Sequence, residues 1–124
     1  RIEPDGIAPP AANYAHAVLS DHTGRILHTS GVVPIAPDGS VPAGVADQAA
    51  VVWSSISAIL AEASMGPADI VSVVTYVVVG EDLGSVMTAR DVALEGNLVA
   101  STLVYVPNLA QPAWKVEVAV VAVA

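Results

Sequence analysis

The residue best suited to chemistry is Glu117, a carboxylate inside a valine-rich segment near the C-terminus. Side chains alternate along a strand, so Glu117 is predicted to share a face with Lys115 and Ala119. A partly buried carboxylate can hold a water molecule and accept a proton from it. Two simpler roles stay open, which are an ion pair with Lys115 and plain exposure near a strand end.

Tyr14 and the pair Ser30-Gly31 are the next candidates. Tyr14 is the sole aromatic residue among the first forty, and a phenol can stack on a planar ligand and offer one hydrogen bond. Ser30 supplies a hydroxyl group, and Gly31 allows the backbone to approach a ligand closely. An ordinary interface tyrosine and an ordinary turn are the alternatives.

The histidines raise the question of a metal site. His16 and His28 face each other only in one hairpin register, and a slip of one residue separates them. Together with Asp21 and His22 they show no spacing typical of metal ligands. We therefore expect no metal and no other cofactor, although His16 could exchange a proton near neutral pH.

These residues depend on a predicted α+β fold. Turn residues at 21–24 favour a hairpin. The residue patterns predict helices at 45–63 and 83–95. They predict strands at 15–20, 25–30, 71–79, 102–106 and 115–123. Asp82 is predicted to cap the second helix and Gly96 to end it. This order predicts a mixed sheet with both helices packed on one face.

Two of these segments carry most of the predicted core. The first helix has an apolar stripe formed by Val45, Ala49, Val52, Ile56, Ile59, Leu60 and Ala63. The run 71–79 is rich in β-branched residues, which predicts a central strand buried on both faces.

Composition limits the class of protein. The 124 residues predict one domain spanning 1–124; 54% are apolar, and a small domain cannot hide them all, so we expect a subunit interface. There is no cysteine, no apolar run long enough to span a membrane and no signal-peptide pattern, so we expect a cytoplasmic protein without a membrane partner. A formal charge of −8 with scattered cations argues against nucleic acid as a partner.

Four segments, in order, resemble the reactive-intermediate deaminase family, also called YjgF or Rid: Asn13-Tyr14-Ala15-His16-Ala17, Ser30-Gly31-Val32-Val33-Pro34, the run 69–77 and Lys115-Val116-Glu117-Val118. The resemblance implies a chorismate-mutase-like α+β fold. It also implies a homotrimer with three small-molecule sites at the subunit boundaries. In that family the matching glutamate holds the attacking water and the matching tyrosine lines the pocket.

The chain departs from the family pattern at the ligand-binding positions. Ala100, followed by Ser101, stands where deaminating members carry the arginine that grips the substrate carboxylate. Met87 stands for an asparagine and Val32 for a glutamine, while Leu103, Tyr105 and Trp114 are expected around the former arginine site as an apolar wall. Arg90 is the only replacement cation in view, and a solvated helix face is the favoured place for it.

The resemblance and the departures together predict a divergent imine or enamine hydrolase. Its substrate is expected to be neutral, or to come from a compound other than an amino acid, because Ala100 cannot bind a carboxylate. Glu117 would position water, and Ser30, Tyr14 and backbone amides would hold the ligand. The alternative is a non-catalytic trimer that binds a small metabolite.

Overall fold

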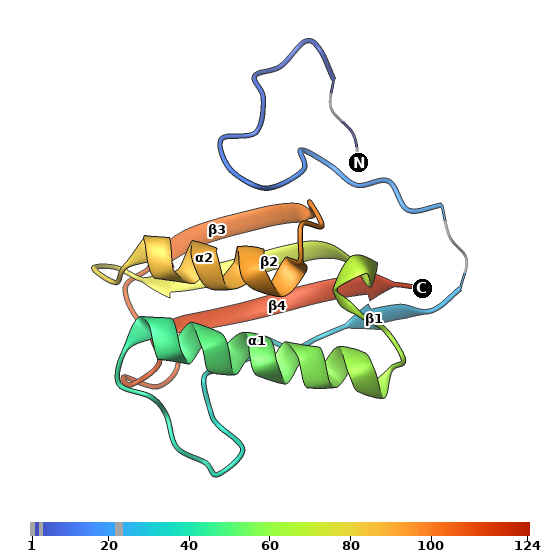
Figure 1. Ribbon diagram of the computed structural model, residues 1–124. Coiled ribbons are helices and arrows are strands. Elements are labelled where there is room, and N and C mark those ends of the chain that lie inside the picture. The colour runs from blue at the N-terminus through green and yellow to red at the C-terminus, as the bar shows by residue number, and fades with distance from the viewer. Residues whose placement is uncertain (1, 3, 22–23) are drawn as a thin grey trace.

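The computed structural model describes residues 2, 4–21 and 24–124, which form one sheet with two helices on one of its faces (Figure 1). In chain order the elements are β1 (Ile26–His28), α1 (Val45–Glu62), the 3₁₀ turn η1 (Pro67–Asp69), β2 (Ile70–Val78), α2 (Leu83–Leu94), β3 (Ala100–Val106) and β4 (Val116–Val123). The sheet order is β1-β4-β2-β3. Strands β2 and β3 are parallel and the other pairs are antiparallel, so the predicted mixed α+β architecture is confirmed.

The central strand β2 is buried on one face only. Val73, Thr75 and Val77 point into the core beneath the helices, while the residues between them are half-exposed. The prediction of burial on both faces is therefore wrong for the single chain. A valine-rich strand forms here because β-branched side chains pack well on a pleated surface, but the helices cover only one side of it.

Helix α1 supplies the opposite half of the core. Its buried residues are Val45, Gln48, Ala49, Val52, Trp53, Ile56 and Leu60. The predicted stripe is correct except at Ile59, which is 38% exposed because it lies on the flank of the stripe. Trp53 and Gln48, which the hydrophobic pattern did not single out, take buried positions beside the stripe.

Helix α2 begins and ends where the sequence predicts. The Asp82 side chain accepts a hydrogen bond from the Gly84 backbone N–H at 3.1 Å, and its second oxygen accepts one from the Ser85 hydroxyl at 2.6 Å. Glu95 closes the helix in a left-handed conformation with φ 52°, and Gly96 follows at φ 84°. These local signals hold α2 in place over β2 and β3.

The predicted hairpin of residues 15–20 with 25–30 is wrong. Ala15 forms an isolated parallel bridge with Ala100 at the β3 edge, whereas β1 pairs with β4 at the other edge of the sheet. The chain between them crosses from one edge to the other instead of turning back (Figure 1). Residues 22 and 23, at the centre of the predicted turn, lie outside the described residues.

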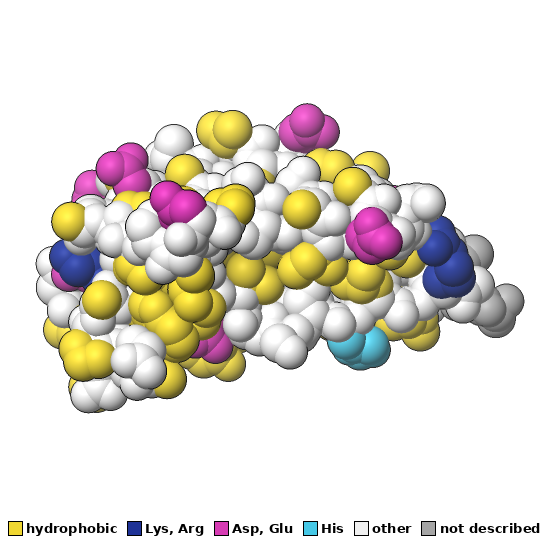
Figure 2. Space-filling model, turned by 90° about the horizontal axis from the view of Figure 1, so that it is seen from below, with side chains coloured by type: hydrophobic (Ala, Val, Ile, Leu, Met, Phe, Trp, Pro, Cys, Tyr) yellow, Lys and Arg dark blue, Asp and Glu magenta, His cyan; other side chains and the backbone are white. Residues whose placement is uncertain are grey.

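The face of the sheet away from the helices is open and largely apolar. It carries Val74 and Tyr76 of β2, Val104 of β3, and Val121 of β4, and Val104 is 40% exposed. Figure 2 looks at the molecule from below, edge-on to the sheet, and there hydrophobic atoms lie among scattered acidic groups, with Lys and Arg side chains only at the two ends of the view. Within the described residues no helix is long and apolar enough to cross a membrane.

Candidate functional site

Glu117 and Gly31 meet at one end of the sheet. The segment around Val32 pairs with β4 through two backbone hydrogen bonds, Val32 N–H to Val118 O at 2.6 Å and Val118 N–H to Val32 O at 3.1 Å. This pairing lays Gly31 directly against the Glu117 side chain. A Cβ at Gly31 would lie 2.7 Å from Cδ of Glu117 and would overlap its carboxylate. We call Ser30, Gly31, Val32 and Glu117 the Glu117 end.

The Glu117 carboxylate does not form the ion pair that the sequence left open. Lys115 Nζ instead lies 3.6 Å from Oε1 of Glu81, in the turn after β2. Within the described residues Glu117 makes no salt bridge and no side-chain hydrogen bond, and it is half-buried. Its oxygens therefore remain able to bind water or a ligand.

Tyr76 is a neighbour of Glu117 that the sequence did not reveal. The two residues are directly paired between β2 and β4, so both side chains lie on the open face. Val104 of β3 is paired with Tyr76 on its other side. An aromatic ring beside the carboxylate could contact a planar ligand, but finding it needed the strand register.

A second group of predicted residues forms a cavity at the β3 edge, about 260 Å³ in volume. Its lining combines the N-terminal segment, α2 and β3, and consists of Ala12, Tyr14, Met87, Arg90, Ser101 and Leu103. We call this the Tyr14 pocket. The Tyr14 hydroxyl accepts a hydrogen bond from the Ala11 N–H at 3.1 Å, which helps to hold the ring over the cavity.

Arg90 corrects an expectation from the sequence. It does not lie on a solvated helix face, since the residue is only 3% exposed. Its Nε donates to Oδ1 of Asp91 at 3.1 Å, and its Nη1 makes a long hydrogen bond of 3.4 Å to the Ser101 hydroxyl. Helical rotation, which the sequence alone did not fix, turns this side chain inward toward β3.

Ala100 and Arg90 lie on opposite faces of β3. Ala100 is paired with Ser72 and belongs to the open face, together with Glu117. Ser101, the partner of Arg90, is paired with the buried Val73 and faces the helices. Arg90 therefore contacts Ser101, the residue after Ala100, from the helix side of β3. It does not occupy the space that a longer side chain at position 100 would fill.

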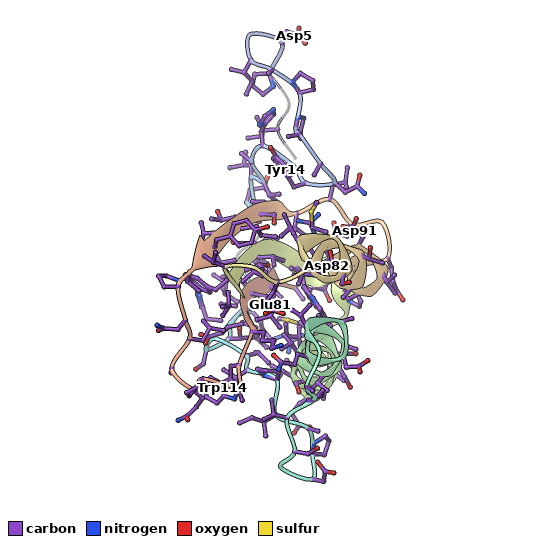
Figure 3. The ribbon with its side chains drawn as sticks, turned by 90° about the vertical axis from the view of Figure 1, so that its left-hand side faces the viewer. Asp5, Tyr14, Glu81, Asp82, Asp91 and Trp114 are labelled. Carbon is purple, nitrogen blue, oxygen red and sulfur yellow. The ribbon has the colours of Figure 1, made fainter. Side chains whose placement is uncertain are left out.

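Tyr105 and Trp114 do not surround Ala100, contrary to expectation. Tyr105 lies near the far end of β3 and is exposed. Trp114 precedes β4, at the end of the molecule opposite Tyr14 and Asp91 (Figure 3). Because β3 and β4 run in opposite directions, the start of one strand lies beside the end of the other.

The same topology separates the two groups of candidate residues within one chain. Ala100 is paired with Ser72 and Glu117 with Tyr76, which are four residues apart on β2. At about 3.3 Å per residue, Ala100 and Glu117 are roughly 13 Å apart along the sheet. The pocket residues Ser101 and Leu103, paired with Val73 and Thr75, face the helices on the other side of the sheet from Glu117. The Glu117 end and the Tyr14 pocket can act on one small ligand only if they come from different copies of the chain.

Gln48 positions the strand that carries Glu117. This fully buried side chain donates to the carbonyl oxygens of Pro42 and Ala113, each at 2.8 Å, and accepts from the Lys115 N–H at 2.8 Å. It thereby joins α1 to the loop before β4. Sequence reasoning missed Gln48 because a polar residue on an apolar stripe carries no signal of its partners.

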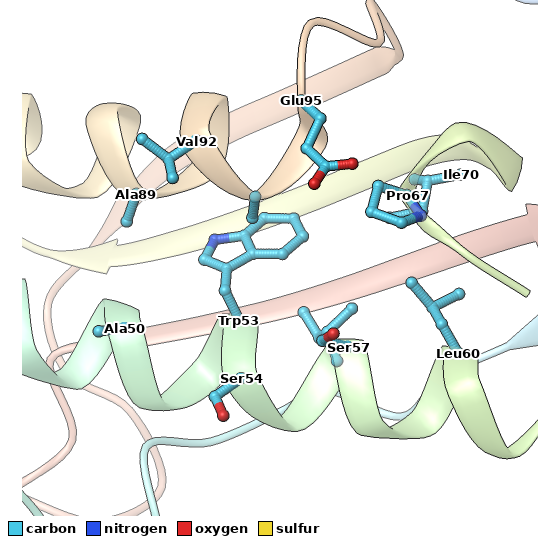
Figure 4. Close-up of a pocket in the computed structure, with 12 residues that line it drawn as sticks. Ala50, Trp53, Ser54, Ser57, Leu60, Pro67, Ile70, Ala89, Val92 and Glu95 are labelled. Atoms are coloured by element: carbon cyan, nitrogen blue, oxygen red, sulfur yellow. The ribbon is translucent and has the colours of Figure 1, made fainter.

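A larger groove lies between the two helices, with a volume of about 470 Å³ (Figure 4). Trp53 forms its floor, and Glu95 points toward the indole ring from the end of α2. None of the residues predicted for the site lines this groove. It is separated from Glu117 by the sheet, so the chemistry inferred from the sequence does not belong there.

The histidines are not gathered. His16 contacts the Ala8 carbonyl oxygen through Nε2 at 2.7 Å, and its ring meets that of Tyr14 edge-on at 6.2 Å between centroids. His28 lies on β1 at the other edge of the sheet, and His22 is outside the described residues. No cluster of three metal-ligating side chains occurs in the part of the chain that the structure describes.

Comparison with known proteins identifies the family to which the chain belongs. The family model described as endoribonuclease L-PSP matches residues 6–124, nearly the whole chain. The chain belongs to this family, that of the YjgF and Rid proteins. The family identified from the four sequence segments is thus confirmed, whereas no curated protein matches the chain.

Solved structures of the family share the fold over most of the chain. YyfB from Yersinia pestis, a Rid family protein of unknown function, is 28% identical with a TM-score of 0.84, over 98% of this chain and 95% of that one. The YjgF protein of E. coli is also 28% identical, with a TM-score of 0.74 over 90% and 93%. E. coli TdcF with bound serine, at 22% identity and a TM-score of 0.75 over 91% and 95%, supports the fold alone.

Proposed function

We propose that the chain hydrolyses an imine or enamine, with Glu117 as the group that positions and deprotonates water. The water oxygen would form a bond to the imine carbon while Glu117 accepts the proton. Return of that proton to the nitrogen would give a carbinolamine. Glu117 would then carry the remaining hydroxyl proton to the nitrogen, so that the carbonyl group forms as the carbon–nitrogen bond breaks and the amine is released. The step needs only the carboxylate, water and the substrate, so no cofactor is proposed.

One observation supports this reading above the others, which is the contact between Glu117 and Gly31. A carboxylate that only stabilised the strand would be expected to pair with Lys115, but Lys115 is paired with Glu81. Gly31 leaves space for the carboxylate where any larger residue would overlap it. The geometry thus favours a free, half-buried carboxylate held in one place, as a general base requires.

We propose further that the active assembly is a homotrimer with its sites between subunits. The open face of the sheet is apolar and would be covered by another copy. One copy would supply the Glu117 end and a neighbour the Tyr14 pocket. Light scattering at micromolar concentration should give about three times the 12.5 kDa chain mass, and a monomer would contradict both the interface and the shared site.

The proposed substrate class excludes the simple 2-imino acids. In such a molecule the carboxylate is attached to the carbon that water attacks, so a cation would be needed on the same side as Glu117. Ala100 is on that side and carries no charge, whereas Arg90 is on the other. A wholly neutral ligand was expected on the assumption that Arg90 lies on a solvated helix face. Because Arg90 is buried, that assumption does not hold.

Nucleic acid remains a poor substrate despite the family's description as an endoribonuclease. A nuclease needs clustered cations along a phosphate path. Here Lys115 pairs with Glu81, Arg25 donates to the Ala63 carbonyl oxygen, and Arg90 is buried. We also keep the cytoplasmic location as a prediction.

The test is the substitution Glu117→Gln, which preserves shape while removing the base. A thermal-shift screen of cyclic and aromatic imines would first identify a ligand, and hydrolysis would then be followed by absorbance. We expect turnover to fall by about 10²–10⁴-fold with ligand affinity unchanged. Glu62→Gln, on the exposed end of α1, is the matched control and should retain full activity.

A non-catalytic binding protein is the second candidate, and the position of the Tyr14 pocket favours it. That cavity is lined by residues of one chain and lies on the side of the sheet opposite Glu117. A protein that used it alone would bind its ligand without consuming it. If every imine that binds the wild type is recovered unchanged, the hydrolase proposal fails and the binding role stands.

A further inference from the structure

Arg90 is a buried cation whose hydrogen-bonding capacity is only partly used. Nε and Nη2 both lie 3.1 Å from the same oxygen, Oδ1 of Asp91, but only Nε has hydrogen-bond geometry toward it. Nη2 is fully buried and has no hydrogen-bond partner among the described residues. A guanidinium group carries donors on all three nitrogens, and leaving a buried charged donor unsatisfied is costly.

The neighbouring residues do not meet this demand. The other oxygen of Asp91, Oδ2, accepts from Asn13 Nδ2 at 3.0 Å and so is directed toward the N-terminal segment. The Ser101 hydroxyl lies at 3.4 Å from Nη1, a long contact. The guanidinium therefore lacks the pair of close, coplanar acceptors that arginine usually finds in a buried site.

The residue that carries this unsatisfied group lines a cavity. Arg90 is the one charged residue among those that line the Tyr14 pocket, and Tyr14, Met87 and Leu103 supply apolar walls. A volume of about 260 Å³ suits a small metabolite rather than a peptide or a nucleotide. The combination of an arginine and apolar walls is suited to a ligand with an anionic head and a planar or apolar body.

We infer that the Tyr14 pocket binds a small monocarboxylate, with Arg90 as the residue that recognises the carboxylate group. A carboxylate offers two coplanar oxygens that match the guanidinium. Asp91 already offsets part of the positive charge, which favours a single negative charge over the two of a phosphate. This inference rests on the proposed function only in taking the pocket as the substrate side of the shared site.

The inference also refines the substrate class. Arg90 and Ala100 are on opposite sides of β3, so a carboxylate held by Arg90 does not occupy the position that an arginine in place of Ala100 would serve. The acid group of the ligand would then be separated from the imine carbon by the ligand's own body. A carboxylate on an aromatic or cyclic imine fits this arrangement, and a 2-imino acid does not.

The experiment measures binding without requiring turnover. Calorimetry would compare benzoate, its neutral isostere benzamide, and inorganic phosphate on the wild-type protein. We expect benzoate to bind at least about tenfold more tightly than either of the others, because they lack the charge or the matching geometry. Equal affinity for benzoate and benzamide, or no binding of benzoate, would overturn the inference.

Two substitutions place the effect on Arg90. Arg90→Met should weaken benzoate binding by about ten- to a hundredfold while leaving benzamide unchanged. Arg25→Met, which removes an exposed arginine bonded to the Ala63 carbonyl, should change neither. If Arg90→Met does not fold, Arg90→Lys keeps the charge without the planar fork and should still weaken benzoate binding, and unchanged binding would contradict the inference.

The inference and the proposed function fail in different ways. Glu117→Gln should not weaken benzoate binding, because it removes a negative charge and leaves Arg90 in place. Loss of hydrolysis without loss of benzoate binding affects only the proposed reaction. If Arg90→Met lowers thermal stability and the wild type ignores benzoate, Arg90 merely joins α2 to β3, and the inference is rejected.

Discussion

The two ends of the sheet differ in how they hold their polar groups. At the Glu117 end a carboxylate lies half-exposed against a glycine, without an ionic partner among the described residues. In the Tyr14 pocket a cation is almost fully buried beneath α2, with Asp91 on one side and an unfilled donor on the other. The first arrangement suits a group that must meet water, and the second suits a group that must recognise charge.

In the proposed function this difference would place reaction and recognition on opposite sides of one sheet. Side chains on the open face of β3 belong with Glu117, and those on the helix face belong with Arg90. We propose that the single chain holds two half-sites that assembly brings together. Substitutions at one of the two groups of residues can test whether the two groups have these different roles.

The largest effect is expected from Gln48→Ala, which acts on the Glu117 end through the fold. The substitution removes the donor from two carbonyl oxygens and the acceptor from the Lys115 N–H, all near the start of β4. We expect a loss of about 3 kcal/mol in the free energy of unfolding. Urea unfolding measures this free energy, and Gln111→Ala in the exposed loop is the control. A loss below about 1 kcal/mol would show that Gln48 does not hold β4 in position.

Gly31→Ala should act on chemistry more than on stability. The new methyl group would overlap the Glu117 carboxylate and displace it, and a displacement of about 1 Å can reduce turnover by about 10²-fold. Benzoate binding in the Tyr14 pocket should change much less than turnover, because Arg90 is untouched. Gly6→Ala, where a methyl group meets no neighbour, is the control, and equal activity of the two variants would contradict the assigned geometry.

Tyr14→Ala should act on ligand binding in the Tyr14 pocket. Loss of the ring removes one wall of the pocket and is expected to weaken benzoate binding by about tenfold. Wild-type affinity in this variant would show that the ring does not contact the ligand. Tyr14→Phe should bind almost as the wild type does, since the hydroxyl accepts its hydrogen bond from the Ala11 N–H on the exposed side.

The smallest effect concerns pH and the start of α2, which carries Arg90. Hydrogen bonds from the Ser85 side chain, and then from the backbone, lower the pKa of Asp82 below its usual 3.8. Its contribution to stability should be complete above about pH 4 and disappear as the pH falls through the lower folded-state value. Melting curves of the wild type and Asp82→Ala should therefore converge in acid, and Ser85→Ala should shift that convergence upward.

The sequence predicted what depends on local signals. Asp82 and Gly96 mark the ends of α2 because capping and left-handed backbone involve only neighbouring residues. The strand alternation also placed Glu117 correctly on the half-buried face of β4. The family resemblance then supplied the overall fold, which the structure confirms.

The missing parts depend on long-range pairing. Tyr76 meets Glu117 only through the register of β2 with β4, and Arg90 turns inward only through the rotation of α2 over β3. The hairpin prediction failed because Ala15 finds its partner at Ala100, far along the chain. Turn residues at 21–24 favour a reversal but cannot choose between two edges of the same sheet.

The central claim is that the Glu117 end of one copy meets the Tyr14 pocket of another. The chain has no cysteine, so Ser30→Cys and Met87→Cys give two variants with one thiol each, one at each end. After the two variants are refolded together, a short bismaleimide should join them into a species of twice the 12.5 kDa chain mass, whereas either variant alone should stay uncoupled. Absence of coupling in a mixture that assembles normally would contradict the shared site.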